Sequence, residues 1–122
     1  MSTQEIPPWL REQLARFEQL QQSIQSILIQ KQQMEMEMAE VNRASAELSK
    51  TGDDVVLYKS AGTLMVRARK VDMVKELEER KDLANTRKTV LGKQEARLRE
   101  SAKELQLKIN EGIKGRTPSS SA

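Results

Sequence analysis

Apolar side chains recur every three or four residues across the first half of the chain. From Leu10 to Leu48 this spacing continues for more than five heptads, with nine of its twelve positions apolar, which is typical of a coiled-coil helix. Prolines are tolerated at a helix start, so Pro7-Pro8 indicates where the helix begins, and Thr51-Gly52-Asp53-Asp54 ends it. We predict an N-terminal arm at residues 1–8 and a coiled-coil helix at residues 9–50. Its seam positions are Leu10, Gln13, Phe17, Leu20, Ile24, Ile27, Lys31, Met34, Met38, Val41, Ser45 and Leu48.

A weaker pattern of the same period occupies the second half of the chain. It predicts a second coiled-coil helix at residues 71–114 with Asp72 as its N-cap, followed by a disordered tail at residues 115–122 that is rich in serine. If the two helices pair antiparallel, Phe17 faces Leu105 and Leu48 faces Val74. The second seam consists of Val74, Leu77, Lys81, Ala84, Lys88, Leu91, Glu95, Leu98, Ala102, Leu105, Ile109 and Gly112.

The stretch between the helices, VVLYKSAGTLMVRA at residues 55–68, has the apolar and β-branched composition of a β-hairpin within residues 53–70. We place its turn at Ser60-Ala61-Gly62. A two-stranded hairpin is marginal alone in water, and an exposed apolar edge promotes aggregation unless it is paired. We therefore predict that the hairpin joins hairpins of other chains in a closed sheet. The predicted interface residues are Val55, Val56, Leu57, Tyr58, Gly62, Leu64, Met65 and Val66.

The predicted fold class is mainly α. It is a long antiparallel two-helix coiled coil with a central β-hairpin that assembles into an oligomeric β-barrel. Charged residues make up 32% of the chain and aromatic residues only 2%, which favours long helices over a thick globular core.

Composition also narrows the classes of function. The chain has no cysteine and no histidine, so the commonest metal ligands and the commonest general base are missing, and no phosphate-binding glycine motif is present. We expect no enzyme activity, no catalytic residue, no metal and no cofactor. No apolar run approaches the roughly 18 residues of a membrane span, and we see no signal peptide. We expect a cytoplasmic protein without a membrane partner.

The hairpin residues YKSAGTLMV, set between two heptad helices of matched length, resemble the β-type subunits of archaeal prefoldins. The glutamine-rich opening EQLARFEQLQQSIQSILIQKQQ is similar to that family as well. The resemblance covers residues from about 8 to about 114, and the single hairpin is similar to β-type rather than α-type subunits.

The resemblance implies a fold, a function and partners. Prefoldins are hexamers of two α and four β subunits, whose hairpins form a β-barrel from which six coiled coils project. They are ATP-independent holdases whose coiled-coil tips bind non-native client proteins and deliver them to a group II chaperonin. The implied partners are therefore a prefoldin α subunit, further β subunits, unfolded clients and the chaperonin.

The helix ends distant from the hairpin carry apolar residues beyond the seam positions. We hypothesise that these residues bind clients, because mobile apolar groups can contact many unfolded sequences without a defined pocket. The alternative is that they only hold the helix ends together. The client-binding candidates are Ile6, Trp9, Leu10, Leu14, Phe17, Leu107, Ile109 and Ile113.

Two other functions are compatible with a long antiparallel coiled coil. An RNA-binding helical arm would need a basic face of one sign, whereas the charges here are interleaved around a net charge of +3, so we expect no nucleic-acid partner. A structural tether would use the hairpin only as a connector. Replacement of hairpin valines by lysine would then leave the oligomeric state of the tether unchanged.

Overall fold

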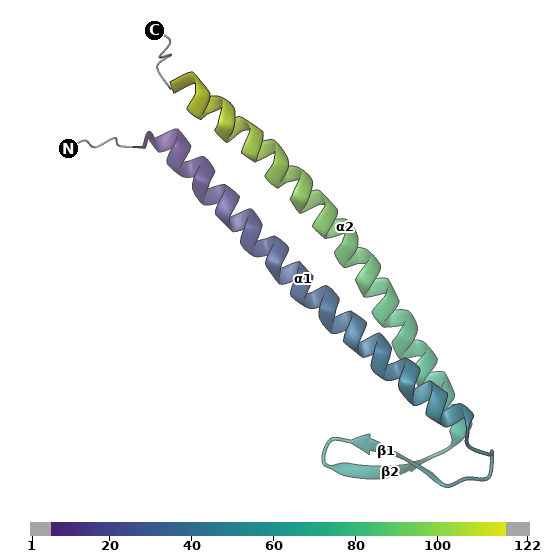
Figure 1. Ribbon diagram of the computed structural model, residues 1–122. Coiled ribbons are helices and arrows are strands. Elements are labelled where there is room, and N and C mark those ends of the chain that lie inside the picture. The colour runs from purple at the N-terminus through teal and green to yellow at the C-terminus, as the bar shows by residue number, and fades with distance from the viewer. Residues whose placement is uncertain (1–5, 117–122) are drawn as a thin grey trace. The chain divides into compact units, whose positions relative to one another are not determined.

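The computed structural model describes residues 6–116 and consists of two long helices that flank a β-hairpin (Figure 1). The elements are α1 (Pro8–Ser49), β1 (Leu57–Ala61), β2 (Leu64–Ala68) and α2 (Lys70–Arg116). The predicted mainly α fold with a central hairpin is confirmed. Residues 1–5 of the predicted arm and 117–122 of the predicted tail lie outside the described residues. Residues 115–116, which we assigned to the tail, continue α2.

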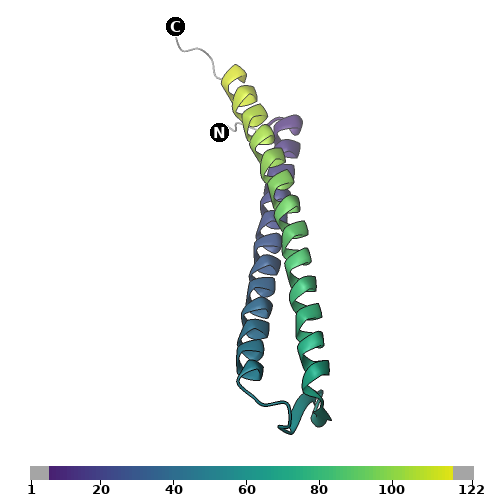
Figure 2. The ribbon, with the colours of Figure 1, turned by 90° about the vertical axis from the view of Figure 1, so that its right-hand side faces the viewer.

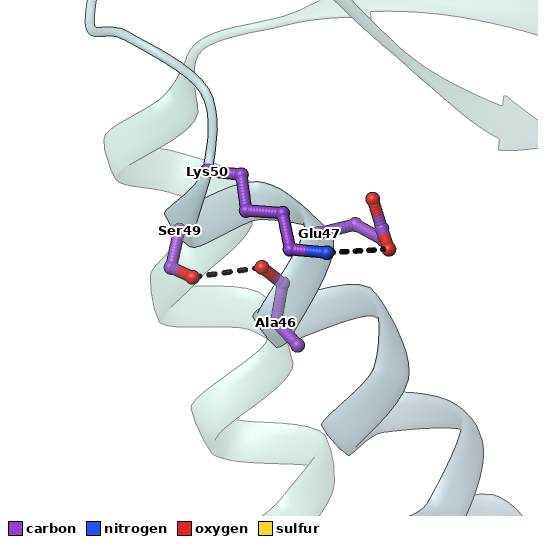
Figure 3. A network of polar contacts seen from close by, with 4 residues as sticks. All are labelled: Ala46, Glu47, Ser49 and Lys50. Atoms are coloured by element: carbon purple, nitrogen blue, oxygen red, sulfur yellow. Dashed lines mark hydrogen bonds and ion pairs between the residues drawn. The ribbon is translucent and has the colours of Figure 1, made fainter.

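Helix α1 begins at Pro8, where the backbone N–H of Arg11 donates to the Pro7 carbonyl at 3.0 Å. Figure 3 shows its C-terminal end, where the Ser49 hydroxyl donates to the Ala46 carbonyl at 2.7 Å. Such bonds satisfy carbonyls of the last turn, which have no partner inside the helix. Local side chains thus end α1 directly before the loop that leads to the hairpin.

Helix α2 begins at Lys70, directly after the hairpin. The backbone N–H of Met73 donates to the Arg69 carbonyl at 3.0 Å, so Arg69 takes the N-cap position. Asp72, which we predicted as the N-cap, lies inside the first turn, where its carboxylate interacts favourably with the helix dipole. The Lys70 ammonium donates to the Thr51 carbonyl at 2.6 Å, and this bond joins the start of α2 to the chain that leaves α1.

The chain divides into two compact units, each of which combines segments that are distant in sequence. Unit 1 comprises Met1–Gln30 and Leu91–Ala122, and unit 2 comprises Lys31–Val90. In each unit a stretch of α1 runs beside an antiparallel stretch of α2, as both views show (Figures 1 and 2). The hairpin belongs to unit 2.

An apolar cluster at the helix ends forms a core in unit 1. Leu10, from the first turn of α1, is buried with Leu105 and Ile109 from the last part of α2. Phe17 and Leu20 pack against this cluster. The predicted placement of Phe17 against Leu105 is therefore consistent with the observed packing.

A second cluster forms a core in unit 2, where the helices meet the hairpin. It consists of Val41, Leu48 and Leu77, with Leu57 and Met73 packed against them. Val41 is only 1% exposed. Since Leu57 comes from β1, the hairpin contributes to the core of the helix pair.

The predicted pairing of Leu48 with Val74 is wrong. Val74 is 37% exposed, and Met73 packs against the cluster in its place. Met73 lies four residues before Leu77 and Val74 lies three before it, and both spacings fit a helix face. The side chain of Leu57, which the seam pattern does not include, fills this end of the core.

Ion pairs link α1 and α2 within unit 2. The Arg80 Nε donates to Glu37 Oε1 at 2.9 Å, and the Lys88 Nζ lies 3.5 Å from Glu35 Oε1. Partly exposed pairs of this kind contribute little free energy individually. Their placement is nevertheless specific to one antiparallel alignment of the two helices.

The two strands of the hairpin pair antiparallel, from Leu57 opposite Ala68 to Ala61 opposite Leu64. The turn is therefore the two-residue loop Gly62-Thr63, and the predicted turn at Ser60-Ala61-Gly62 is wrong in its extent. Gly62 has a φ of 64°, and among the described residues it alone has a positive φ. A positive φ at the first loop residue only is the type II′ pattern, whose twist suits a hairpin. Glycine adopts it without strain.

We predict that Leu48→Ala lowers the free energy of unfolding by about 2–5 kcal/mol, because it leaves a cavity in the unit 2 core. Leu83→Ala is the control, since Leu83 is an exposed leucine of α2 and its loss should change stability by less than about 0.5 kcal/mol. Chemical unfolding followed by circular dichroism measures both. Equal effects of the two substitutions would contradict the assigned core.

Candidate interaction surfaces

Exposed apolar side chains concentrate in two regions of the described chain. In unit 2, eight of the eleven exposed large apolar residues lie between residues 55 and 74. In unit 1, five of six lie in the end segments 6–14 and 107–113, the exception being Ile29. Single exposed apolar residues are normal on any protein surface, but local concentrations mark interaction sites.

We call the first region the hairpin surface. It consists of Val55, Val56, Tyr58, Leu64, Met65, Val66, Val71 and Val74. Six of these eight residues are among the predicted interface residues. Of the other two predicted positions, Leu57 is partly buried in the unit 2 core and Gly62 forms the turn.

The pairing of the strands divides the hairpin into two faces. Tyr58 and Met65 lie on one face, and Leu57, Leu64 and Val66 lie on the other, because side chains alternate along a strand. Both faces are apolar in part, although the sheet has only two strands. Each strand also has one edge without a strand partner in this sheet. The hairpin can therefore accept further strands and further apolar cover.

Contacts to the helices fix the hairpin in place. Leu57 packs into the unit 2 core, and the Lys59 ammonium lies 3.1 Å from Glu76 Oε2 on α2. Before the hairpin, the Lys70 ammonium lies 3.6 Å from Asp53 Oδ1 and donates to the Thr51 carbonyl, which ties the start of α2 to the chain that enters β1. The apolar residues of the hairpin are thus held on a supported element rather than on a free loop.

Val71 and Val74 were missed as surface residues by the sequence interpretation. Together with Val55 and Val56 they line a groove of about 640 Å³ at the base of the hairpin, with Arg69 among its charged residues. Val74 was assigned to the seam, and Val71 to no role. Their i, i+3 spacing in the first turns of a helix could have indicated a shared apolar surface. A coiled-coil seam has the same spacing, however, so the spacing alone does not separate the two.

We call the second region the helix-end surface. Its members are Ile6, Trp9, Leu14, Leu107 and Ile113, which are exposed by 39% to 55%. Two other predicted client-binding residues, Leu10 and Ile109, are only 5% and 3% exposed. These two stabilise the helix pair and do not belong to the exposed surface. Phe17 is partly buried against them.

Both surfaces consist of large apolar side chains. The described residues contain no group of three or more histidine, cysteine, aspartate or glutamate side chains that could hold a metal ion. None of the described helices carries an apolar stretch that could span a bilayer. The two surfaces offer apolar contact and, at the hairpin, unpaired strand edges. This arrangement suits binding to other polypeptides.

Comparison with known proteins gives a consistent result over nearly the whole chain. The prefoldin subunit family matches at residues 11–116. A prefoldin subunit beta of Methanothrix thermoacetophila is 40% identical over 109 residues, which cover 89% of this chain and 91% of that protein. A prefoldin subunit beta of Pyrobaculum neutrophilum is also 40% identical over 109 residues, which cover 89% of this chain and 86% of that protein.

A solved structure is similar in fold as well as in sequence. The crystal structure of the prefoldin beta subunit from Thermococcus strain KS-1 has a TM-score of 0.80 and 36% identity. It covers 95% of this chain and 100% of its own.

We predict that Gly62→Ala destabilises the hairpin by about 1–2 kcal/mol, because a Cβ atom disfavours the left-handed conformation of the turn. Amide hydrogen exchange should show lower protection in β1 and β2 of this variant. Gly92→Ala is the control, since a Cβ at Gly92 meets nothing within 4 Å and its φ is not positive. Unchanged hairpin protection in Gly62→Ala would show that the turn does not depend on glycine.

Proposed function

The chain belongs to the prefoldin family as a β-like member, and because members of this family are chaperone subunits, we propose that it is one subunit of an ATP-independent holdase. In this proposal the hairpin surface joins subunits and the helix-end surface holds non-native proteins. The observation that carries the proposal is the concentration of exposed apolar residues in these two regions.

Assembly through the hairpin would supply the strand partners and the apolar cover that the hairpin of a single chain lacks. Leu64 and Met65, directly after the turn, are about two-thirds exposed, and their strand has an edge without a strand partner. Hairpins of neighbouring subunits would pair with these edges and cover the apolar faces, as closure of a sheet into a barrel removes all edges. We propose the hexamer of the family, with two α and four β subunits and a β-barrel built from their hairpins.

Client binding is proposed for the five exposed residues of the helix-end surface. Trp9 offers the largest apolar area among them, and its ring combines a broad contact surface with little conformational freedom. The buried cluster of Leu10, Leu105 and Ile109 lies in the same segments and holds the two helices together. The exposed residues can therefore contact an unfolded chain while the helix pair stays intact.

The same proposal includes delivery of the client to a group II chaperonin and a cytoplasmic location. Membership of the family supports both parts of the proposal. The client itself would be defined by exposed apolar side chains, since the helix-end surface offers apolar contacts.

We predict that Trp9→Ala combined with Leu14→Ser weakens client binding roughly tenfold or more, since each removes an exposed apolar contact. The measurement is suppression of aggregation of reduced, denatured lysozyme by the complex assembled with an α-type subunit. Ile29→Ala is the control, because Ile29 is an exposed apolar residue of α1 outside both surfaces. Full suppression by the double variant in a correctly assembled complex would refute the helix-end surface as the client site.

A further inference from the structure

Gly112, near the end of α2, contacts the tryptophan at the start of α1. A Cβ atom built on Gly112 would overlap the indole ring of Trp9, most closely at Cη2, with Cζ3 at 2.7 Å and Cζ2 at 3.0 Å. The benzene half of the ring therefore lies against the backbone of α2 at this glycine. No such contact exists at Gly92 or Gly115, the other two glycines of α2, where a Cβ meets nothing within 4 Å.

Glycine is the poorest helix former after proline, so another residue at this position would favour the helix more. At Gly112, however, any other residue would place its Cβ where the ring lies. The heptad pattern includes Gly112 among the positions that face α1. The pattern alone does not reveal that an aromatic ring packs against this glycine. The structure shows this contact.

The contact leaves part of the ring free. Trp9 is 42% exposed, although its benzene half meets α2. The adjacent Leu10 is buried with Ile109, three residues before Gly112, so the backbone on both sides of the contact is anchored in the unit 1 core. The indole thus packs against α2 on one side and still presents apolar surface to solvent.

We propose that Gly112 is a positioning residue that seats Trp9 for client binding. This inference rests on the proposed function of the helix-end surface. A ring held in one orientation loses less conformational freedom when it binds than a ring that moves freely. Gly112 would therefore raise the affinity for clients through Trp9, without itself contacting them.

The seating of the ring can be measured directly, because Trp9 is the only tryptophan of the chain. In the full chain, Gly112→Ala should shift the tryptophan emission to longer wavelength and increase its quenching by acrylamide. Gly115→Ala is the matched control, since it makes the same change nearby in α2 where a Cβ meets open space. Identical emission and quenching in Gly112→Ala and the unmodified chain would overturn the proposed seating.

The role in binding requires a second comparison, in the assembled complex with reduced, denatured lysozyme as the client. Gly112→Ala should weaken binding roughly two- to tenfold, the range expected for freeing one side chain. In a Trp9→Ala background, Gly112→Ala should weaken client binding no further. A general structural effect of Gly112→Ala would weaken binding in both backgrounds. An equal loss in both backgrounds, or no loss in either, would overturn the positioning role.

These outcomes are separable from a failure of the proposed function. If Trp9→Ala with Leu14→Ser leaves client binding intact, the helix-end surface is not the client site and the positioning role fails with it. If that double variant loses binding while Gly112→Ala shifts the fluorescence but not the affinity, only the positioning role is overturned.

Discussion

A two-stranded hairpin cannot cover its own apolar side chains, and the rest of this structure depends on that constraint. Leu57 turns into the core of unit 2, but Tyr58, Leu64 and Met65 remain exposed, and each strand has an edge without a strand partner in the sheet. Burial of such surface is the main favourable term in association between proteins. The proposed assembly, in which several chains contribute hairpins to one larger sheet, would bury this surface.

The helices serve two purposes that use the same heptad pattern differently. In unit 2 their core receives Leu57 and supports the hairpin, helped by the contact between Lys59 and Glu76. In unit 1 a similar core of Leu10, Leu105 and Ile109 closes the helix ends, while Trp9 remains partly exposed beside it. Membership of the prefoldin family relates these features to a chaperone subunit. In the function that we propose, assembly and client binding use different parts of one chain.

The sequence predicted the element order because heptad spacing and a β-branched stretch are strong local signals. It failed where two spacings are equally acceptable, as at Met73 and Val74, of which Met73 packs against the unit 2 core and Val74 is exposed. It also misplaced the turn, since strand pairing decides that Ser60 and Ala61 belong to β1. The separation of buried Leu10 from exposed Trp9, and the contact of Trp9 with Gly112, depend on how the helices face each other. A single sequence does not specify that geometry.

The most direct measurement is the mass in solution by light scattering, with the chain alone and then mixed with an α-type subunit from the same source. Assembly through the hairpin predicts a defined complex on mixing, with a mass that fits two α and four β chains. It also predicts that Val56→Lys combined with Val66→Lys abolishes this complex, because both residues belong to the hairpin surface. A monomer or plain dimer under all conditions, or a complex that tolerates both lysines, would contradict it and favour a coiled-coil tether.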